Sequence, residues 1–410
     1  MKDERLLTEG EFLQARADEA LGRRAKKLGL SRRRLLQLVA VGGAVVVSGA
    51  GLTRRAQAAA PTPVVKATPE DLFFDFGSNK EMRWENLYKR GYLVPNELFF
   101  VRNHTRTPRI DVTGWRLRID GSGVQRSLEL TYDELLGLPS VSVMRYVECA
   151  GNGRSFFETY QGKKAQGTQW KLGAIGVAEW TGVPLREILD RAGLKRTAVD
   201  VMPEGLDDLK VRRPMSLAKA LEPDTLLVYA MNGEALLPDH GFPVRVLVPG
   251  WIGVANIKWV GRVQVSEEPL FSSWNTDTYV FIGPDYKPNP PAKGTVLSSQ
   301  TVKSALELPW DGEVARARQL VRGRSWSPFG KIAQVDYSVD AGSWKKATLR
   351  EPNIAQAWAR WDFEWDAGPG KHNIRVRATD EKSNGQPDRV AFNEQGYLYN
   401  AVVDHPITVK

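Results

Sequence analysis

The single cysteine of the chain, Cys149, has the side chain best suited to bind a metal. It lies in the segment Arg145-Tyr-Val-Glu-Cys-Ala-Gly-Asn-Gly-Arg-Ser155, whose glycines permit close approach of a bulky group to the backbone. A thiolate suits a soft or high-valent metal, and with one protein sulfur the other ligands must come from an organic cofactor. The alternative is a cysteine that only packs in the core. The segment therefore predicts either a cofactor-bound metal or a packing residue.

The cysteine and histidine counts exclude several other kinds of metal site. One cysteine rules out an internal disulfide, a CxxCH haem attachment and cysteine-rich zinc or iron–sulfur sites. We therefore expect no haem in this chain. The 4 histidines, His104, His240, His372 and His405, argue against an all-histidine metal cage.

Arg102 is the clearest candidate for binding an anion. It lies in an apolar, strand-like run, where an unpaired guanidinium is costly, so an anionic ligand is its expected partner. Two other candidates keep alternatives. His240, between Asp239 and Gly241, fits a ligand contact or a structural turn, and Tyr279 fits a site or a core residue.

Residues 1–58 carry an export pattern that resembles a twin-arginine signal peptide. Ser31-Arg-Arg-Arg-Leu-Leu36 precedes a weakly apolar stretch, and Ala56-Gln-Ala58 is a small-residue cleavage site. The stretch is short for a membrane span. We expect cleavage near Ala58, a periplasmic or otherwise exported protein, and no stable membrane span afterwards. The alternative is an uncleaved amphipathic or membrane anchor.

The net charge of +9 does not indicate a nucleic-acid partner. Residues 1–58 contain 12 basic and 6 acidic residues, which leaves 45 basic against 42 acidic in the remainder of the 57 and 48. No basic stripe interleaved with aromatic residues remains to bind a phosphate backbone.

Residues 71–290 predict an α+β region of mixed short strands and helices. Apolar runs at 245–248 and 260–263 are typical of strands. The segment 131–136 predicts a helix, because Thr131 is a favourable N-cap and acidic residues follow it. Residues 185–192 predict another helix. A break follows at 284–291, where Pro, Asn and Asp dominate.

From residue 299 to 410 the pattern changes to alternation of apolar and polar residues. Val335, Tyr337 and Val339 show it, and similar runs surround Phe363 and Val376. Turn signals separate these runs, so we expect an immunoglobulin-like β-sandwich. A chain of 410 residues accommodates both domains, 71–290 and 299–410.

Six segments, in their order and spacing, resemble the sulfite oxidase family of molybdenum enzymes. They are Phe100-Val-Arg-Asn-His104, Glu148-Cys-Ala-Gly-Asn152, Gly205-Leu-Asp207, Asp239-His-Gly-Phe-Pro-Val-Arg245, Asn256-Ile-Lys-Trp259, and Trp274 with Tyr279 five residues later. The resemblance covers nearly all of the chain after the leader. It implies a sulfite-oxidase-like molybdopterin domain followed by a β-sandwich that dimerises.

The resemblance also implies a molybdenum–molybdopterin cofactor with Cys149 as the metal ligand. The cofactor contacts that it implies are Phe100, Val101, Arg102, Asn103, His104, Cys149, Asp207, His240, Arg245, Asn256, Ile257 and Lys258. The catalytic residues that it implies are Arg102, Cys149, Tyr279 and His104.

The implied reaction is transfer of an oxygen atom to sulfite or a related inorganic sulfur compound, as in bacterial sulfite dehydrogenases and SoxC-like sulfane dehydrogenase subunits. Without haem in the chain, electrons would pass to a separate c-type cytochrome. Two alternatives remain open. One is a sulfoxide reductase of the same superfamily, and the other is a non-enzymatic exported binding protein in which Cys149 is only buried.

Two residues depart from the family pattern. After Asn152 the chain has Gly153-Arg154 where animal and plant sulfite oxidases have two arginines, and Gln395 stands where those enzymes place a sulfite-binding arginine. A missing cation weakens the case for free sulfite and favours a bulkier or less charged sulfur compound, such as a protein-bound sulfane or sulfonate. On this reasoning Gln395→Arg lowers KM for sulfite.

Four aromatic residues crowd one short stretch of the predicted sandwich: Trp358, Trp361, Phe363 and Trp365. They predict either a homodimer surface or ordinary core packing.

Overall fold

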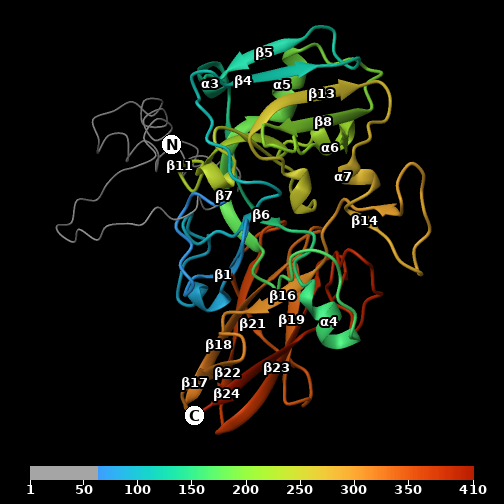
Figure 1. Ribbon diagram of the computed structural model, residues 1–410. Coiled ribbons are helices and arrows are strands. Elements are labelled where there is room, and N and C mark those ends of the chain that lie inside the picture. The colour runs from blue at the N-terminus through green and yellow to red at the C-terminus, as the bar shows by residue number, and fades with distance from the viewer. Residues whose placement is uncertain (1–62) are drawn as a thin grey trace, which may run out of the picture.

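The computed structural model describes residues 63–410, which form several sheets joined by few, short helices (Figure 1). The predicted signal peptide, residues 1–58, lies outside these residues. Within residues 63–410 no helix is long and apolar enough to cross a membrane.

Two five-stranded sheets form the upper part of the molecule in Figure 1. The first has the order β11-β10-β7-β6, with β12 also paired to β10, and is antiparallel. The second has the order β5-β4-β13-β8-β9, in which β13 and β4 are parallel. This mixture is the α+β arrangement expected from the sequence. The strands are β4 (Arg116–Asp120), β5 (Leu128–Thr131), β6 (Val141–Glu148), β7 (Ile175–Pro184), β8 (Asp200–Gly205), β9 (Met215–Ser216), β10 (Leu226–Met231), β11 (Glu234–Ala235), β12 (Arg245–Leu247) and β13 (Val260–Ser266).

Two smaller sheets carry further candidate residues. Arg102 ends β3, and Tyr279 directly precedes β14. The sequence-predicted break at 284–291 lies in the loop between β14 and β15, so it belongs to a hairpin beside Tyr279. The strands are β1 (Phe73–Phe76), β2 (Asn79–Met82) and β3 (Val101–Arg102) in one sheet, and β14 (Val280–Phe281) and β15 (Thr295–Val296) in the other.

The helices are short, and their starts follow local sequence signals. The predicted helix after Thr131 is α3, with a capping box in which Thr131 and Glu134 exchange hydrogen bonds. The helix predicted at 185–192 is α5, which buries Leu185, Ile188 and Leu189 on one face. The helices are α3 (Tyr132–Leu136), α4 (Ser155–Gln161), α5 (Leu185–Arg191), α6 (Leu217–Ala220) and α7 (Ser273–Thr276), with the 3-10 turns η1 (Trp84–Leu87), η2 (Pro238–His240) and η3 (Gly253–Ala255).

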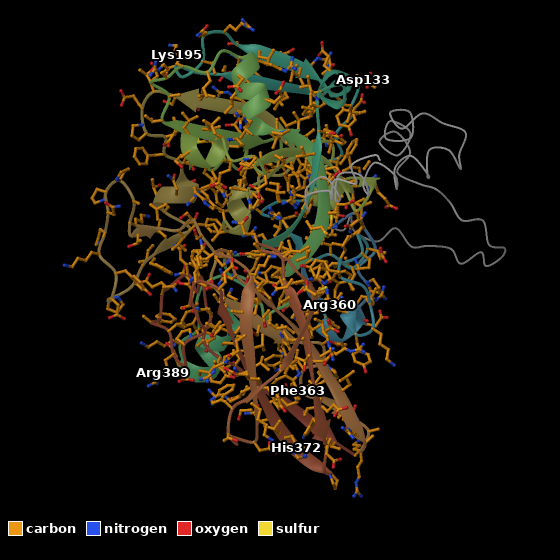
Figure 2. The ribbon with its side chains drawn as sticks, turned by 180° about the vertical axis from the view of Figure 1, so that it is seen from behind. Asp133, Lys195, Arg360, Phe363, His372 and Arg389 are labelled. Carbon is orange, nitrogen blue, oxygen red and sulfur yellow. The ribbon has the colours of Figure 1, made fainter. Side chains whose placement is uncertain are left out.

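The C-terminal region consists of a four-stranded sheet, β16-β18-β22-β21, and a five-stranded sheet, β17-β24-β23-β19-β20. The three alternating runs predicted from the sequence are parts of β19, β22 and β23. Their apolar residues, together with those of β18 and β24, form a separate core between the two sheets. Figure 2 shows Phe363 within this region. The strands are β16 (Lys303–Leu306), β17 (Gly312–Val314), β18 (Arg318–Trp326), β19 (Ile332–Val339), β20 (Lys345–Lys346), β21 (Thr348–Asn353), β22 (Ala359–Asp366), β23 (Gly370–Asp380) and β24 (Asp404–Val409).

The crowded aromatic residues are core residues. Trp358, Trp361, Phe363 and Trp365 are all buried. Of the two explanations offered by the sequence, core packing is therefore the one that applies within a single chain. Trp358 belongs to the larger hydrophobic core, most of whose residues precede the C-terminal region. Because residues between 326 and 403 also belong to this core, the N-terminal and C-terminal regions are in apolar contact.

Candidate functional site

A pocket of about 710 Å³, partly open to solvent, gathers the candidate residues. Of the sequence-predicted contacts only Val101 does not line it. Five of the six residues 99–104 line the pocket, whereas Val101 is buried and does not. The pocket walls missed by the sequence analysis are Phe99, Val147, Val211, Asp239, Gly253, Val254 and Trp259.

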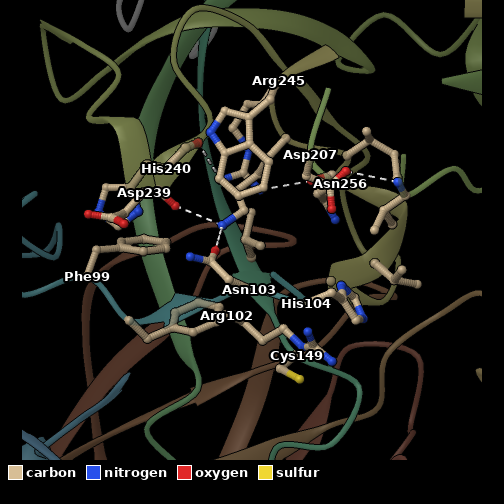
Figure 3. Close-up of a pocket in the computed structure, with 18 of the residues that line it drawn as sticks. Phe99, Arg102, Asn103, His104, Cys149, Asp207, Asp239, His240, Arg245 and Asn256 are labelled. Atoms are coloured by element: carbon tan, nitrogen blue, oxygen red, sulfur yellow. Dashed lines mark hydrogen bonds between the residues drawn. The ribbon is translucent and has the colours of Figure 1, made fainter. Parts of the chain in front are cut away.

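Cys149 follows the last residue of β6 and lies beside Arg102 (Figure 3). Its N–H donates to Ala174 O at 2.9 Å, and its carbonyl accepts from Asn152 N at 2.9 Å, so a tight turn fixes its backbone. Gly253 packs against this turn, since a Cβ there would lie 2.7 Å from Glu148 O. The cysteine is buried and yet lines the pocket, which is the geometry that a metal ligand requires.

Arg245 is a buried cation that the described residues provide with carbonyl oxygens and no carboxylate. Its Nη1 donates to His240 O at 3.1 Å and its Nη2 to Asn256 O at 3.2 Å, whereas Nε has no hydrogen-bond partner. Burial lowers the pKa of Arg245 to about 9. A buried guanidinium with an unused donor fits a negatively charged group in the pocket.

Lys258 adds a second cation at the same end. Its Nζ donates to Asn103 Oδ1 and to Asp239 O. Burial, followed by the charge of Arg245, lowers the pKa of Lys258 well below its ordinary value. Two basic side chains at one end of the pocket fit a negatively charged group such as a phosphate.

Asp239 and His240 have structural partners on the far side of the pocket wall. The Asp239 carboxylate accepts from the N–H groups of Val65 and Lys66, so it fixes the first described residues against η2. His240 Nε2 lies 3.2 Å from Asn96 O, and burial lowers its pKa well below the ordinary value. His240 therefore serves as a turn residue and also lines the pocket, which combines the two alternatives from the sequence.

Asp207 and Asn256 shape the pocket through backbone contacts. Asp207 Oδ1 accepts from Val211 N at 2.9 Å, and Asn256 Oδ1 accepts from Val248 N at 2.7 Å. Burial raises the pKa of Asp207 above its ordinary value. Both side chains thus hold the loops that contribute the pocket's walls.

Tyr279 and His104 form a hydrogen-bonded pair, with Tyr279 Oη 3.1 Å from His104 Nε2. Burial raises the pKa of Tyr279, and the charge of Arg102 opposes this only in part. Burial, together with the charges of Arg102 and Lys258, lowers the pKa of His104 well below its ordinary value. At neutral pH the pair is therefore a phenol hydrogen-bonded to a neutral imidazole, and the pair has no net charge.

Arg102 holds the charge at this end of the pocket. Burial disfavours its charge, but Tyr279 and Cys149 outweigh burial and raise the pKa of the guanidinium above its ordinary value. Figure 3 shows Arg102, His104 and Cys149 together at one end, and His240, Arg245 and Asn256 at the other. The pocket thus has a thiol end and a cationic end.

Two arginines near Tyr279 were not singled out by the sequence analysis as site residues. Arg154 donates to Gln395 O and Thr168 O, both at 2.8 Å, and its guanidinium lies 5.3 Å from the ring centroid of Tyr397. Arg213 is buried, donates to the carbonyls of Trp274 and Leu297, and has an unpartnered Nε. Arg154 occupies the second position of the arginine pair noted in the sequence, whereas no local sequence signal distinguishes Arg213 from a surface arginine. Burial raises the pKa of Tyr279, and the positive charges of Arg154 and Arg213 partly oppose this increase because they lie near its phenol.

Gln395 does not line the pocket, and its side chain contacts the loop that carries Tyr279. Its Oε1 accepts from Tyr279 N at 3.2 Å, and its Nε2 donates to Asp277 O at 2.8 Å. Both ends of the amide therefore hold the backbone of Tyr279, whose φ of 56° is unusual for a non-glycine residue. Gln395 is a positioning residue.

The glycine at 153 has a local structural reason. Its φ is +98°, and a Cβ there would lie 3.1 Å from Tyr399 O. An arginine at this position would strain the backbone and displace the segment that carries Tyr399.

The residues present fit a cofactor-borne metal at Cys149. Across residues 63–410, no three His, Cys, Asp or Glu side chains gather to hold a metal ion. A metal bound by Cys149 would therefore take its remaining ligands from a cofactor, and Arg245 and Lys258 would neutralise an anionic part of that cofactor.

Comparisons with known proteins agree with this geometry. An oxidoreductase molybdopterin binding domain matches residues 104–274, and a Mo-co oxidoreductase dimerisation domain matches residues 295–410. The chain is 37% identical over 336 residues to mitochondrial sulfite oxidase of Homo sapiens, covering 77% of this chain and 61% of that protein. It is 37% identical over 350 residues to sulfite oxidase of Gallus gallus, covering 79% and 74%.

Among solved structures, the sulfane dehydrogenase SoxCD from Paracoccus pantotrophus resembles the chain with a TM-score of 0.71 and 26% identity, covering 87% of this chain and 92% of that one. The chain thus spans about three fifths of the length of the mammalian relatives and almost all of the bacterial structure.

Proposed function

The chain belongs to the sulfite oxidase family of molybdenum enzymes, and on that premise we propose that it oxidises a small inorganic sulfur compound by oxygen-atom transfer. The observation that carries the proposal is the pocket with two ends, a buried thiol beside Arg102 and a buried guanidinium, Arg245, without a carboxylate partner. When bound, the molybdenum cofactor would supply the transferred oxygen and accept two electrons. Over one cycle water provides the oxygen atom, and two protons and two electrons leave.

The residues of the chain would hold the cofactor at both ends. Cys149 would be the protein ligand of the metal. Arg245 and Lys258 would bind the anionic end, because each has lost much of the hydration that stabilises its charge. Asp207 and Asn256 would keep the surrounding loops in place.

Arg102, Tyr279 and His104 would bind the substrate. Arg102 retains its charge and would orient an anion at the thiol end. Tyr279 has a raised pKa and remains protonated, so its phenol would donate its one hydrogen to an oxygen atom of the substrate. In that arrangement Nε2 of His104 carries a proton and donates to the phenol oxygen. Neutral His104 adds no competing charge.

The preferred substrate is a sulfane sulfur compound, with free sulfite as the second candidate, because the sulfur atom of each has a lone pair that can accept an oxygen atom. The similarity to SoxCD over nearly the whole of both chains supports the first. The identity to animal sulfite oxidases supports the second.

The partners are proposed on the same basis. The match of residues 295–410 to a dimerisation domain supports a homodimer. A c-type cytochrome would accept the electrons. The twin-arginine pattern in residues 1–58 supports an exported, periplasmic protein. A sulfoxide reductase and a non-enzymatic binding protein remain the competing functions.

Metal analysis and steady-state assays test the proposal. Protein purified from a host that makes the cofactor should contain about one molybdenum per chain, and Cys149→Ser should abolish turnover. Sulfite, thiosulfate and a sulfoxide should be assayed with cytochrome c and with reduced viologen. Oxidation of a sulfur anion with cytochrome c supports the proposal. Reduction of the sulfoxide alone would identify a reductase, and molybdenum-free protein would favour the binding protein.

A further inference from the structure

A buried ion pair joins the C-terminal β-sandwich to the turn that carries Cys149. Lys303 Nζ, from β16, lies 2.7 Å from Glu148 Oε1, and the two side chains are 1% and 0% exposed. Taking two charges out of water costs nearly as much as their attraction returns, so such a pair adds little net stability. Its position beside the thiol suggests a different role.

The ion pair encloses Cys149 from both sides along the chain. Lys303 Nζ also donates to Asn152 O at 2.9 Å, and Asn152 Nδ2 donates to Glu148 Oε1 at 2.9 Å. Glu148 precedes the cysteine and Asn152 ends its turn. One ammonium group therefore connects the two ends of the five-residue segment that contains the thiol.

Two more side chains of the C-terminal region complete the network. Trp326 Nε1 donates to Glu148 Oε2 at 3.0 Å, and Gln300 Nε2 donates to Glu148 O at 2.7 Å. Both side chains are buried. Since each Glu148 oxygen has a fixed donor, the carboxylate has one orientation, and the backbone next to it is rigid.

We propose that Lys303, acting through Glu148 and Asn152, is a positioning residue for the Cys149 thiolate, so that the β-sandwich sets the geometry of the metal–sulfur bond. The inference rests on the proposed function in one respect, that Cys149 is the molybdenum ligand. It gives residues 299–410 a part in the site in addition to dimerisation. Groups that orient a metal ligand typically change metal affinity or activity about 10–100-fold when removed.

The matched variants are Lys303→Met and Arg324→Met. Arg324 forms the other fully buried ion pair of the adjoining strands, 2.6 Å from Glu307, with the side chains 0% and 5% exposed. Its further partners are the carbonyls of Gly91 and Tyr92, which lie outside the Cys149 turn. Both variants leave a carboxylate unpaired in the interior, but only Lys303→Met releases the turn.

The holoenzymes are compared by molybdenum content, by the thiolate-to-molybdenum charge-transfer absorption and by kcat per molybdenum. Lys303→Met should shift the absorption and lower kcat per molybdenum about 10–100-fold. Arg324→Met should lower Tm while both readouts stay at wild-type values. Wild-type absorption and kcat in Lys303→Met, or equal changes in both variants, would overturn the proposal.

A second variant covers the case in which Lys303→Met does not fold. Glu148→Gln keeps the shape of the side chain and removes its charge, and it should also shift the absorption. An unchanged band would refute the inference. Wild-type protein without molybdenum would overturn this inference together with the proposed function. Molybdenum-loaded wild type that is inactive on every sulfur compound would overturn only the function, because the band comparison still decides the role of Lys303.

Discussion

Replacing Gln395 by methionine tests whether this residue acts on the Tyr279 backbone or on the substrate. Methionine has nearly the same length but neither accepts from Tyr279 N nor donates to Asp277 O, contacts of 3.2 and 2.8 Å in the native protein. Leaving a buried N–H unsatisfied costs about 1–3 kcal/mol, and losing the second hydrogen bond costs about 0.5–1.5 kcal/mol.

The two hydrogen bonds that Gln395→Met removes hold Tyr279, whose phenol is paired with His104. Part of the lost free energy should therefore raise the activation barrier of the reaction. If about half of roughly 3 kcal/mol is expressed in the transition state, kcat/KM falls about 10-fold, because each 1.4 kcal/mol corresponds to a factor of 10. The loss should be mainly in kcat, because Gln395 does not line the pocket and acts on the backbone of Tyr279. Steady-state kinetics with the best sulfur substrate measure it, with Gln334→Met on the sandwich as the control.

Gln395→Arg sharpens the test. The sequence alone leads one to expect a lower KM for sulfite, but a guanidinium has no acceptor for Tyr279 N and would break the same contact. We expect lower kcat without improved sulfite binding. A decrease in KM for sulfite in Gln395→Arg, together with unchanged kinetics in Gln395→Met, would show that the residue faces the substrate and that the reasoning is wrong.

Three further predictions follow from the site and its surroundings. Arg102→Gln should lower kcat/KM for an anionic substrate by about 10²–10³-fold, the loss of a charge-assisted contact of roughly 3–4 kcal/mol; near-normal kinetics would place the anion elsewhere. Arg245→Met should reduce the molybdenum content of the purified protein, because the buried guanidinium is the proposed partner of the cofactor's anionic end; full occupancy in this variant would contradict that assignment. Burial raises the pKa of Glu81 to about 7, so its contribution to folding is present below about pH 4.5 and is lost as the pH rises through 7, by roughly 3 kcal/mol at most. Chemical unfolding from pH 5 to 8 should show the free energy of unfolding falling with pH in the wild type, and this decrease should be lost in Glu81→Gln. An equal pH dependence in both proteins would refute the prediction.

The sequence predicted the local structure of the chain well where short-range physics determines it. Thr131 and Glu134 cap their helix through contacts three residues apart, and alternation at Val335 and Phe363 identifies strands of the C-terminal sheets. Val101 is buried without lining the pocket, and the sequence does not show this, because the residues on both sides of it do line the pocket. The aromatic stretch after Trp358 could not be divided between core and interface from composition alone, because burial depends on what the fold places opposite it.

The sequence by itself determined which residues bear the chemistry, since Cys149 and the segments around Arg102, Arg245 and Tyr279 are recognised by residue type, order and spacing. The tertiary structure alone decided how these residues are held. Gln395 meets the backbone of Tyr279 from 116 positions away, and Lys303 meets Glu148 from 155 positions away. Contacts over such separations leave no periodicity or spacing in the chain. They exist only because folding places two distant segments side by side, and an isolated glutamine or lysine in the sequence reads as an ordinary polar residue.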